Sequence, residues 1–401
     1  MNKTISGAAS VKTSPRLVVP VLGVTQILAW GSSYYLPAVL AQPIAADTGW
    51  SLPWIVGGLS LGLLTAGLAA PFIGRKIRQH GGRPVLAASA LLLAGGLLGL
   101  SLAPNLGIFL LAWLAIGLGM GAGLYDPAFS TLGHIYGQGA RPLIAGLTLF
   151  GGFASTACWP LSAFLAGELG WRGACLTYAL IHLGISLPLY LFALPPGSAR
   201  RILAAPPAQD AVPAPAPPRP PRATFILLAA SIMIGATVST VISVHLLVIL
   251  QAQGLALAAA VALGALVGPS QVGARFIEML IGRYHHPIWT KLASVSCVAI
   301  GLGFLWGGLP ATFLALIFYG AGIGLESIAR ATLPLVLFGP DDYAPIMGQL
   351  ARPSLIAQAA APSVGALMLE LWGAHTALGV VAGVALCNVL LAVSLYRRTM
   401  R

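Results

Sequence analysis

Twelve apolar segments, each long enough to cross a lipid bilayer, constrain the fold of this 401-residue chain more than any other feature. A spanning helix takes about 20 mostly apolar residues, and 58% of the residues are hydrophobic while only 7% are charged. Because lipid offers the backbone no hydrogen-bond partners, such segments fold as helices. They lie at 18–42, 53–74, 84–103, 107–135, 143–166, 172–194, 223–250, 257–281, 288–307, 310–337, 346–369 and 375–396. We therefore predict an all-α integral membrane protein with twelve transmembrane helices.

A repeat in register divides these segments into two sets of six. The repeated residues and their partners 202 or 203 residues later are Gly117/Gly320, Gly119/Gly322, Gly121/Gly324, Gly146/Gly348, Pro160/Pro362, Glu168/Glu370 and Leu169/Leu371. Small residues let membrane helices approach each other closely. Parallel repeats predict two six-helix bundles related about an axis along the membrane normal, with a substrate site near mid-membrane between them.

The segment 195–222 differs from the rest, because its many prolines exclude a continuous helix and favour a partly extended linker. It falls where the two repeats join, and a tether there would let the halves move. The predicted organisation is a cytoplasmic N-terminal tail (1–17), an N-terminal six-helix bundle (18–194), a cytoplasmic linker (195–222), a C-terminal six-helix bundle (223–396) and a cytoplasmic C-terminal tail (397–401).

The net charge of +12 follows membrane topology rather than a nucleic-acid surface. With the N-terminus inside, most of the 21 Lys and Arg residues fall at the inner ends of the segments, including Arg283 and Lys291, and the outer loops hold only Arg172. This bias predicts that both termini are cytoplasmic. No nucleic-acid-binding module is visible, and the N-terminal tail lacks the apolar core of a cleaved signal peptide. We expect a monomeric, multi-pass protein of a bacterial inner membrane.

The loop after the second segment resembles the G-x-x-x-D-R-x-G-x-R loop of the major facilitator superfamily. Gly74, Gly81 and Arg83 match it, whereas Arg78 and Gln79 stand where the family has Asp and Arg. A second set of motifs resembles the bacterial monocarboxylate-porter branch of that superfamily. It comprises Ser33-Tyr34-Tyr35-Leu36-Pro37, Pro127-Ala128, Gly133-x-x-Tyr136, Arg141-Pro142-Leu143 and Gly170-Trp171-Arg172-Gly173. The resemblance implies a twelve-helix transporter that moves a monocarboxylate together with protons.

Two departures from that branch bear on the substrate. Ala38 stands where the porters have a substrate-linked lysine after the proline of the first helix. Gly268-Pro269-Ser270 occupies the place of their Asp/Arg pair in the eighth helix. Lactate or pyruvate is therefore an expectation from the resemblance alone, and a divergent carrier with another substrate fits these residues equally well.

The altered loop predicts a cytoplasmic gate whose charges are exchanged. The resemblance implies an acid that helps to hold the inner gate closed near the start of the eleventh helix. Here the loop carries Arg75, Arg78 and Arg83, and the only acidic inner loop between two helices is Asp341-Asp342. We predict that Arg75 or Arg78 docks on this acidic pair in the outward-open state. The alternative is a solvated turn, whose exposed ion pairs contribute about 0–1 kcal/mol.

Six ionisable residues inside the predicted helices are the main functional candidates, because a charge in the membrane is costly unless it is paired or hydrated. They are Asp126, Arg275, Glu278, Glu326, Arg330 and Arg352. Arg275 and Glu278 are three residues apart, and we interpret them as a paired structural latch near the inner gate. Glu326 and Arg330 are four apart and can also share a helix face.

Asp126 has no basic residue within a turn on its own segment and precedes Pro127, which interrupts the helix and bends it toward a cavity. Besides a purely structural role, two functional roles stay open for this carboxylate. It carries the coupling proton, with Glu326 as the second candidate, or it pairs with Arg330 or Arg352 of the other half and gates transport.

An anionic substrate would need a buried cation, and a guanidinium matches the geometry of a carboxylate. Arg352 lacks an acidic partner on its own helix and is the preferred ligand, with Arg330 next. Neutral polar contacts are expected from the first and seventh helices. The candidates are Gln26, Tyr34, Tyr35, Ser239, Ser243 and His245.

Three classes of function then compete. The first is a proton-coupled carrier of a small organic anion, a monocarboxylate by the resemblance, working by alternating access. The alternative is a proton-antiport exporter of drugs or metabolites, with an apolar cavity formed by residues such as Trp30, Phe150, Phe153 and Trp159. An enzyme is disfavoured, because the chain has no HExxH, no phosphate loop and no nucleophile with paired carboxylates. We expect no cofactor and no metal site.

Overall fold

The computed structural model of this chain describes residues 14–196, 221–308 and 312–400. The predicted N-terminal tail and linker fall almost wholly outside the described residues. Within them the chain forms helices joined by short turns. The N-terminal half comprises α1 (Pro15–Gly31), α2 (Leu36–Thr48), α3 (Leu52–His80), α4 (Gly82–Ser101), α5 (Leu106–Gly123), α6 (Tyr125–Tyr136), the 3-10 turn η1 (Gly137–Gly139), α7 (Ala140–Gly152), α8 (Ala154–Ile181), the π-helical η2 (His182–Ser186) and α9 (Leu187–Ala193).

The C-terminal half repeats this arrangement of helices and turns. It comprises α11 (Arg222–Ala252), α12 (Leu257–Gly264), α13 (Val267–Ile281), the 3-10 turn η4 (Gly282–Tyr284), α14 (Pro287–Trp306) and α15 (Thr312–Thr399). Neighbouring helices join into eight runs that are long and apolar enough to cross a membrane, and two of these runs have 88 residues each.

Glycines with positive φ divide the two long runs into three spans each. They are Gly137 (φ 56°) and Gly170 (φ 69°) in the first run and Gly339 and Gly373 (both φ 75°) in the second. Only glycine adopts this conformation without strain, so each one reverses the chain while the helical hydrogen bonding nearly continues. With these divisions the eight runs become twelve transmembrane helices in two sets of six, as predicted. The turn glycines also keep the repeat, since Gly339 lies 202 residues after Gly137 and Gly373 lies 203 after Gly170.

The repeated glycines pack in the same way in both halves. Gly121 of α5 lies against Ala66 of α3, and Gly324 of α15 lies against Gln271 of α13. Gly119 likewise packs on α4, while Gly322 packs on α14. A Cβ atom at any of these glycines would press on the neighbouring helix, so close backbone approach explains the repeat. Helices α3 and α4 therefore correspond to α13 and α14.

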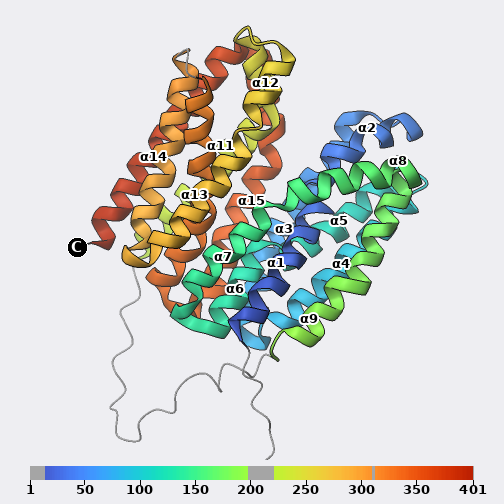
Figure 1. Ribbon diagram of the computed structural model, residues 1–401, viewed down its shortest axis with the longest axis horizontal. Helices are drawn as coiled ribbons and strands as arrows, with labels where there is room; N and C mark the ends of the chain where they lie inside the picture. The colour runs from blue at the N-terminus through green and yellow to red at the C-terminus, as the bar shows by residue number, and fades with distance from the viewer. Residues whose placement is uncertain (1–13, 197–220, 309–311, 401) are drawn as a thin grey trace, which may run out of the picture.

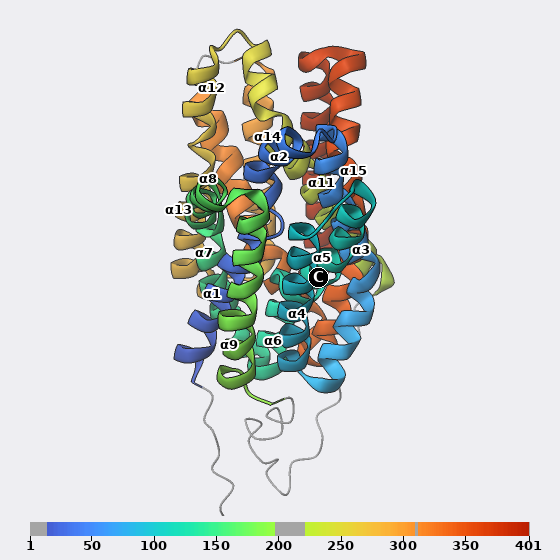
Figure 2. The same cartoon turned by 90° about the vertical axis from the view of Figure 1, so that its right-hand side faces the viewer.

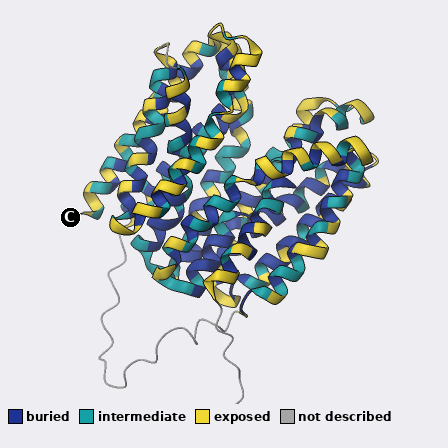
Figure 3. Ribbon diagram, viewed as in Figure 1, coloured by how far each residue is buried: buried dark blue, intermediate teal, exposed yellow. Residues whose placement is uncertain are grey.

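The two halves lean together at one end and separate toward the other (Figure 1). The end that separates carries α2 and α12, and Figure 2 places both at the same end of the molecule. Exposed residues gather on the outer faces of both halves (Figure 3). Many of them are large and apolar, such as Phe164, Phe192 and Leu371, with 63%, 86% and 64% of their surface exposed. Such an apolar outer surface suits contact with lipid tails.

The closed end is sealed by α3 packed against α15. Gly74 lies against the carbonyl of Ala344, and Gly348 lies against the carbonyl of Ala70. Tyr343 of α15 packs on Gly133 of α6 and donates a hydrogen bond to Ala331 O at 2.8 Å. A side chain at either seam glycine would push the halves apart, so this seam depends on backbone contact.

The Gly170-Trp171-Arg172-Gly173 motif stabilises the opposite end of the N-terminal half. Trp171 Nε1 donates a hydrogen bond to Asp47 Oδ2 at 2.9 Å, and Arg172 forms an ion pair with the same carboxylate. The Arg172 guanidinium also lies 4.2 Å from the Trp171 ring centroid. The motif thus fixes the end of α2 on α8, which gives it a structural role.

Candidate binding site between the two halves

A cavity of about 290 Å³ lies between the halves. Its N-terminal wall is mainly aromatic and is formed by Trp30, Tyr34, Tyr35 and Tyr125 together with Gly151, Gly152 and Ser155. Its C-terminal wall combines aliphatic residues with ionisable and polar ones. The polar members are Ser239, Thr240, Ser243, Gln271, Arg275, Ser294, Glu326, Ser327, Arg330, Gln358 and Asn388. The cavity therefore has one aromatic wall and one charged wall.

The aromatic wall depends on a break in the first transmembrane helix. Residues 32–35 form turns between α1 and α2, and Tyr35 N donates to Trp30 O at 3.0 Å. Pro37 fits the first turn of α2, where its missing N–H is harmless. The break turns Tyr34 and Tyr35 toward Trp30, whose ring centroid lies 5.2 and 6.0 Å from theirs. Both tyrosines line the cavity, as predicted.

Gln26 supports this wall instead of lining it. Pro127 has no N–H to donate to Gly123 O, and this free carbonyl accepts a hydrogen bond from Gln26 Nε2 at 2.6 Å. Gln26 Oε1 in turn accepts from Trp30 Nε1 at 3.2 Å. Gln26 is fully buried and lines neither this cavity nor the smaller one described below. Gln26 therefore orients Trp30, and its contact with a substrate stays a prediction without support from this geometry.

Arg275 of α13 is the buried cation of the charged wall. Its residue is only 5% exposed, and Nη1 donates to Thr148 O of the N-terminal half at 2.9 Å. Nη2 contacts Gln271 Oε1 at 3.4 Å, while the buried Nε–H has no partner. Among the residues the structure describes, no carboxylate forms an ion pair with this guanidinium. Gly152 makes its approach possible, since a Cβ there would lie 2.9 Å from Nη1.

The predicted latch between Arg275 and Glu278 is not formed. Glu278 Oε1 accepts from Thr290 Oγ1 at 2.7 Å, and Oε2 lies 3.5 Å from His285 Nε2. Residues three apart point about 60° away from each other around a helix. Arg275 therefore reaches across to the N-terminal half, while Glu278 stays with α14. Sequence spacing made the pair possible, and packing separated it.

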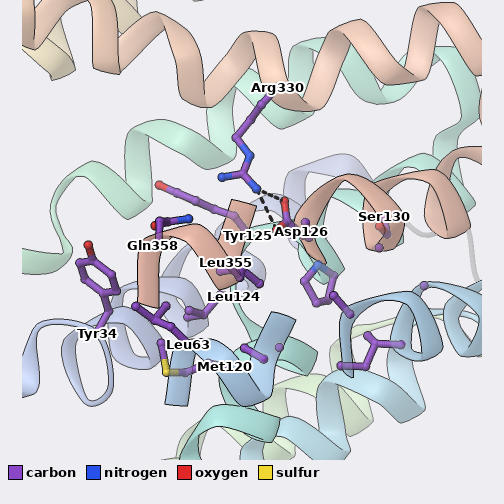
Figure 4. A pocket seen from close by; sticks show the side chains of 18 of the residues that line it. Tyr34, Leu63, Met120, Leu124, Tyr125, Asp126, Ser130, Arg330, Leu355 and Gln358 are labelled. Atoms are coloured by element: carbon purple, nitrogen blue, oxygen red, sulfur yellow. Dashed lines mark hydrogen bonds and ion pairs between the residues drawn. The ribbon is translucent and has the colours of Figure 1, made fainter. Parts of the chain in front are cut away.

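Asp126 and Arg330 form an ion pair between the two halves. Arg330 Nη2 lies 2.8 and 2.9 Å from the two carboxylate oxygens of Asp126. Figure 4 shows Arg330 pointing toward Asp126 across a second cavity, of about 60 Å³, with Tyr34, Leu124 and Gln358 among its labelled residues. Arg330 lines both cavities. This geometry has Asp126 paired with Arg330, and the gating, proton-coupling and structural roles considered for Asp126 stay predictions.

Glu326 pairs within its own half. Its Oε1 lies 2.5 Å from Lys291 Nζ of α14, and its Oε2 accepts from Ser294 Oγ at 2.9 Å. Beside it, Ser231 donates to Asn388 Oδ1 at 2.6 Å. Glu326, Ser294 and Asn388 line the large cavity, so this network lies at its edge.

Sequence reasoning missed Lys291, which it counted among the basic residues of the inner turn. The structure places it in the first turns of α14 with none of its surface exposed. A buried lysine of this kind needs a carboxylate partner, and Glu326 supplies it. The available signal was its position inside the apolar segment 288–307, three residues before Ser294.

Arg352, the preferred substrate ligand from the sequence, is exposed and lines neither cavity. Its role as a ligand stays a prediction that this geometry does not support, because hydrophobicity did not indicate which face of its glycine- and alanine-rich helix meets the cavity. Ser239 and Ser243 do line the large cavity. His245 does not: its Nε2 bonds with Pro362 O at 3.0 Å.

At the closed end the predicted docking of the basic loop on the acidic turn is present. Arg78 Nη1 lies 3.2 Å from Asp342 Oδ1, with 46% and 34% of these side chains exposed. Arg75 and Asp341 are exposed, and Arg83 is half-buried. The gating role of these residues stays a prediction.

A second contact at this end joins α7 to the turn before α14. Arg141 Nη2 donates to His285 O at 2.7 Å. Burial, followed by the nearby Arg141 guanidinium, lowers the pKa of His286. His286 is therefore neutral near pH 7, and its Nδ1 caps α14 by accepting from Ile288 N at 3.2 Å.

Two bundles of six transmembrane helices, with a charged cavity between them, define a membrane transporter. The chain belongs to the Major Facilitator Superfamily, whose family model matches residues 22–351. It is 28% identical over 339 residues to mouse (Mus musculus) monocarboxylate transporter 11, covering 82% of this chain and 66% of that protein. The chain thus spans just under two thirds of that relative's length.

Two solved structures have the same fold. The human organic anion transporter MFSD10 (TETRAN) matches with a TM-score of 0.71 and 15% identity, covering 94% of this chain and 99% of that one. The proton:xylose symporter XylE matches with a TM-score of 0.67 and 12% identity, covering 94% of each chain. At such identities these structures support the fold alone.

Proposed function

We propose that this transporter moves a small organic anion, a monocarboxylate, together with protons by alternating access, and that Arg275 binds the anion. The observation that carries the proposal is the buried guanidinium of Arg275, which lines the large cavity without an ion-pair partner among the described residues. A guanidinium left unpaired in a low-dielectric site strongly favours a carboxylate. The name of the sequence relative, monocarboxylate transporter 11, agrees with this choice.

The charges around the cavity support an anion over a cation. Asp126 pairs with Arg330 and Glu326 pairs with Lys291, so the charges cancel within each pair. Arg275 then leaves one positive charge in excess at the cavity wall. A bound monocarboxylate would neutralise this excess, whereas a cationic substrate would add to it.

The closed end and the predicted topology together support an outward-open state. Arg78 and Asp342 lie at the closed end, which the basic residues predict to be cytoplasmic. Opening toward the cytoplasm would separate α3 from α15 and break the pair between Asp126 and Arg330. We propose that this pair is the gate and that the exposed pair of Arg78 and Asp342 reinforces it.

For proton coupling we propose Glu326 in preference to Asp126. Glu326 lies at the edge of the substrate cavity and pairs inside one half, so its protonation does not require the halves to separate. Protonating it would leave the Lys291 charge unbalanced and make the cavity wall more positive, which favours binding of an anion at Arg275. This links proton and anion uptake in one step. A bacterial inner-membrane location, cytoplasmic termini and a monomeric state complete the proposal.

The aromatic wall favours an exporter of amphipathic compounds as a second candidate. Trp30, Tyr34 and Tyr35 line the large cavity, and the ring centroid of Trp159 lies 6.2 Å from that of Tyr35. Such a wall would bind apolar compounds whether or not they carry a charge. Phe150, one of the residues predicted for this role, instead packs on Gly23.

The test is proton movement in proteoliposomes, read with an internal pH dye while monocarboxylates, dicarboxylates and lipophilic cations are added in turn. Symport predicts acidification with a monocarboxylate, lost in Arg275→Ala and in Glu326→Gln. Arg352→Ala, which removes an exposed cation, is the matched control and should retain the signal. A response to lipophilic cations alone would overturn the proposal in favour of the exporter.

A further inference from the structure

We propose, resting on the anion-carrier function above, that the preferred substrate is an aryl-substituted monocarboxylate. Its carboxylate binds Arg275, and its ring packs against the aromatic wall formed by Trp30, Tyr34, Tyr35 and Tyr125. Four features support this assignment: the closeness of the cation to the wall, the rigidity of the wall, the size of the cavity and the number of unpaired cations.

The carboxylate anchor and the aromatic wall meet at one backbone carbonyl. Thr148 O accepts from Arg275 Nη1 at 2.9 Å and from the Tyr125 hydroxyl at 3.4 Å. Two adjacent glycines of α7 make this possible, since a Cβ at Gly151 would overlap the Tyr125 phenol and one at Gly152 would crowd Arg275. A carboxylate bound to this guanidinium would therefore place its substituent beside Tyr125.

From Tyr125 the aromatic surface continues across the cavity. The Trp30 ring centroid lies 5.1 Å from that of Tyr125 and 5.2 Å from that of Tyr34. These spacings lie within the range at which aromatic rings attract each other. Gln26 holds the Trp30 indole by a 3.2 Å hydrogen bond and is itself bonded to Gly123 O. The ring faces are thus fixed before any substrate enters, which lowers the entropy lost on binding.

The size of the cavity favours a ring over a short chain. An apolar cavity of about 150 Å³ holds one benzene molecule, and the cavity here measures about 290 Å³. A ring with a carboxymethyl group would use this space, whereas a three-carbon acid would leave most of it to water. Aliphatic residues of the opposite wall, including Val272, Val298 and Ile323, would cover the second face of the ring.

The cavity provides for one carboxylate. Arg330 also lines it, but both oxygens of Asp126 bind this guanidinium at 2.8 and 2.9 Å. Lys291 is fully buried against Glu326. A second carboxylate on the substrate would meet these paired groups, with the acids Asp126 and Glu326 close by. A dicarboxylate is therefore disfavoured.

Counterflow in proteoliposomes tests the assignment. Vesicles loaded with unlabelled phenylacetate take up trace radiolabelled phenylacetate, while competitors are added outside: cyclohexylacetate, propionate, pyruvate, phenylacetamide and phenylmalonate. We expect phenylacetate to compete about tenfold better than propionate, since an aromatic contact and ring burial together exceed about 1.4 kcal/mol. Cyclohexylacetate should fall between them, and phenylmalonate should compete weakly.

Variants separate the ring from the carboxylate. Trp30→Leu should reduce the preference for phenylacetate over propionate, whereas Trp54→Leu, which removes an exposed tryptophan on the outer surface, should leave it unchanged. Pyruvate or propionate competing as well as phenylacetate would overturn the aryl assignment and leave anion transport intact. Phenylacetamide competing as well as phenylacetate would instead remove the anion-carrier function itself.

Discussion

The two walls of the central cavity differ in chemistry although the helices behind them repeat. The N-terminal wall presents Trp30, Tyr34 and Tyr35, and its single charge, Asp126, faces the second, smaller cavity. The C-terminal wall presents Arg275, Glu326 and Arg330. In our proposal the first wall holds the body of the substrate, and the second recognises its charge and couples it to protons.

Matching helix contacts show how this difference arose within one scaffold. Gln271 packs on Gly324 as Ala66 packs on Gly121, so Arg275, one turn further along, corresponds to Ala70. By the 203-residue spacing of these glycines, Glu326 corresponds to Gly123. The repeat thus preserves the small residues that bring helices together, while the charges that line the cavity, Arg275, Glu326 and Arg330, stand in one copy only. The two halves therefore share the packing of their helices but differ in the residues that they present to the cavity.

The largest expected effect comes from removing the unpaired cation of the charged wall. Arg275→Ala should weaken binding of the transported anion about 10- to 100-fold, because a hydrogen bond to a charged group contributes about 1.5–3 kcal/mol. Arg275→Lys keeps the positive charge but not the two parallel N–H donors of the guanidinium, so it should recover part of the lost affinity. Equilibrium binding of radiolabelled anion measures both. Unchanged affinity in Arg275→Ala would show that the charged wall does not recognise the substrate.

The second effect concerns coupling at the same wall. Glu326→Gln should abolish accumulation driven by a pH gradient while retaining exchange of external for internal anion, because exchange needs no net proton transfer. Asp126→Asn should retain gradient-driven accumulation at a changed rate. Uptake and exchange assays on both variants in proteoliposomes show which residue carries the coupling proton. If Asp126→Asn loses coupling and Glu326→Gln keeps it, the proton site belongs to the interface between the halves.

The third effect tests the ion pair that joins the two walls. Asp126→Ala leaves Arg330 without its 2.8 Å partner and should shift the balance toward the inward-open state by about 1–3 kcal/mol. Spin labels at Trp50→Cys and Gln253→Cys, at the ends that separate, should report a shorter distance. The exchanged pair Asp126→Arg with Arg330→Asp should restore the longer one. An unchanged distance distribution in Asp126→Ala would contradict a gating role.

A smaller loss of anion affinity is expected from a change at Gly152, where α7 contacts Arg275. Gly152→Ala places a Cβ 2.9 Å from Arg275 Nη1, and the guanidinium end of that side chain can shift away. We expect affinity for the anion to fall by less than in Arg275→Ala. Gly268→Ala is the matched control, since it lines the same cavity with no atom within 4 Å of the new Cβ. Titration of both variants with the transported anion gives the comparison, and equal affinities would mean that Arg275 need not be held beside α7.

The smallest effect belongs to the exposed pair at the closed end. Asp342→Arg should shift the inward–outward balance by about 0–1 kcal/mol, because the pair is half exposed to solvent. The double variant Arg78→Asp with Asp342→Arg should restore the original inward–outward balance. The same spin-label distances measure this shift. A change as large as that of Asp126→Ala would move the main gate to the cytoplasmic surface.

The sequence predicted the twelve spans and the division into halves, because apolar length and repeated glycines follow directly from contact with lipid and with neighbouring helices. It also predicted the contact of Arg78 with Asp342, which joins the last turn of α3 to α15 just beyond Gly339. It failed where partners depend on helix rotation. Spacing paired Arg275 with Glu278, yet each bonds elsewhere.

The remaining site residues needed three-dimensional packing. Arg352 met every sequence criterion for a ligand, but it is exposed. Lys291 looked like a loop residue, but it is buried against Glu326. In helices where small apolar residues occupy every face, hydrophobic periodicity does not identify the side that faces the cavity.

The most direct test of the account is calorimetric binding of the best-transported carboxylate and of its uncharged amide to the protein in lipid nanodiscs. We expect the carboxylate to bind, the isosteric amide not to bind, and Arg275→Gln to lose the binding of the carboxylate. Equal binding of the amide and the carboxylate, unaffected by Arg275→Gln, would contradict recognition of an anion at this cavity.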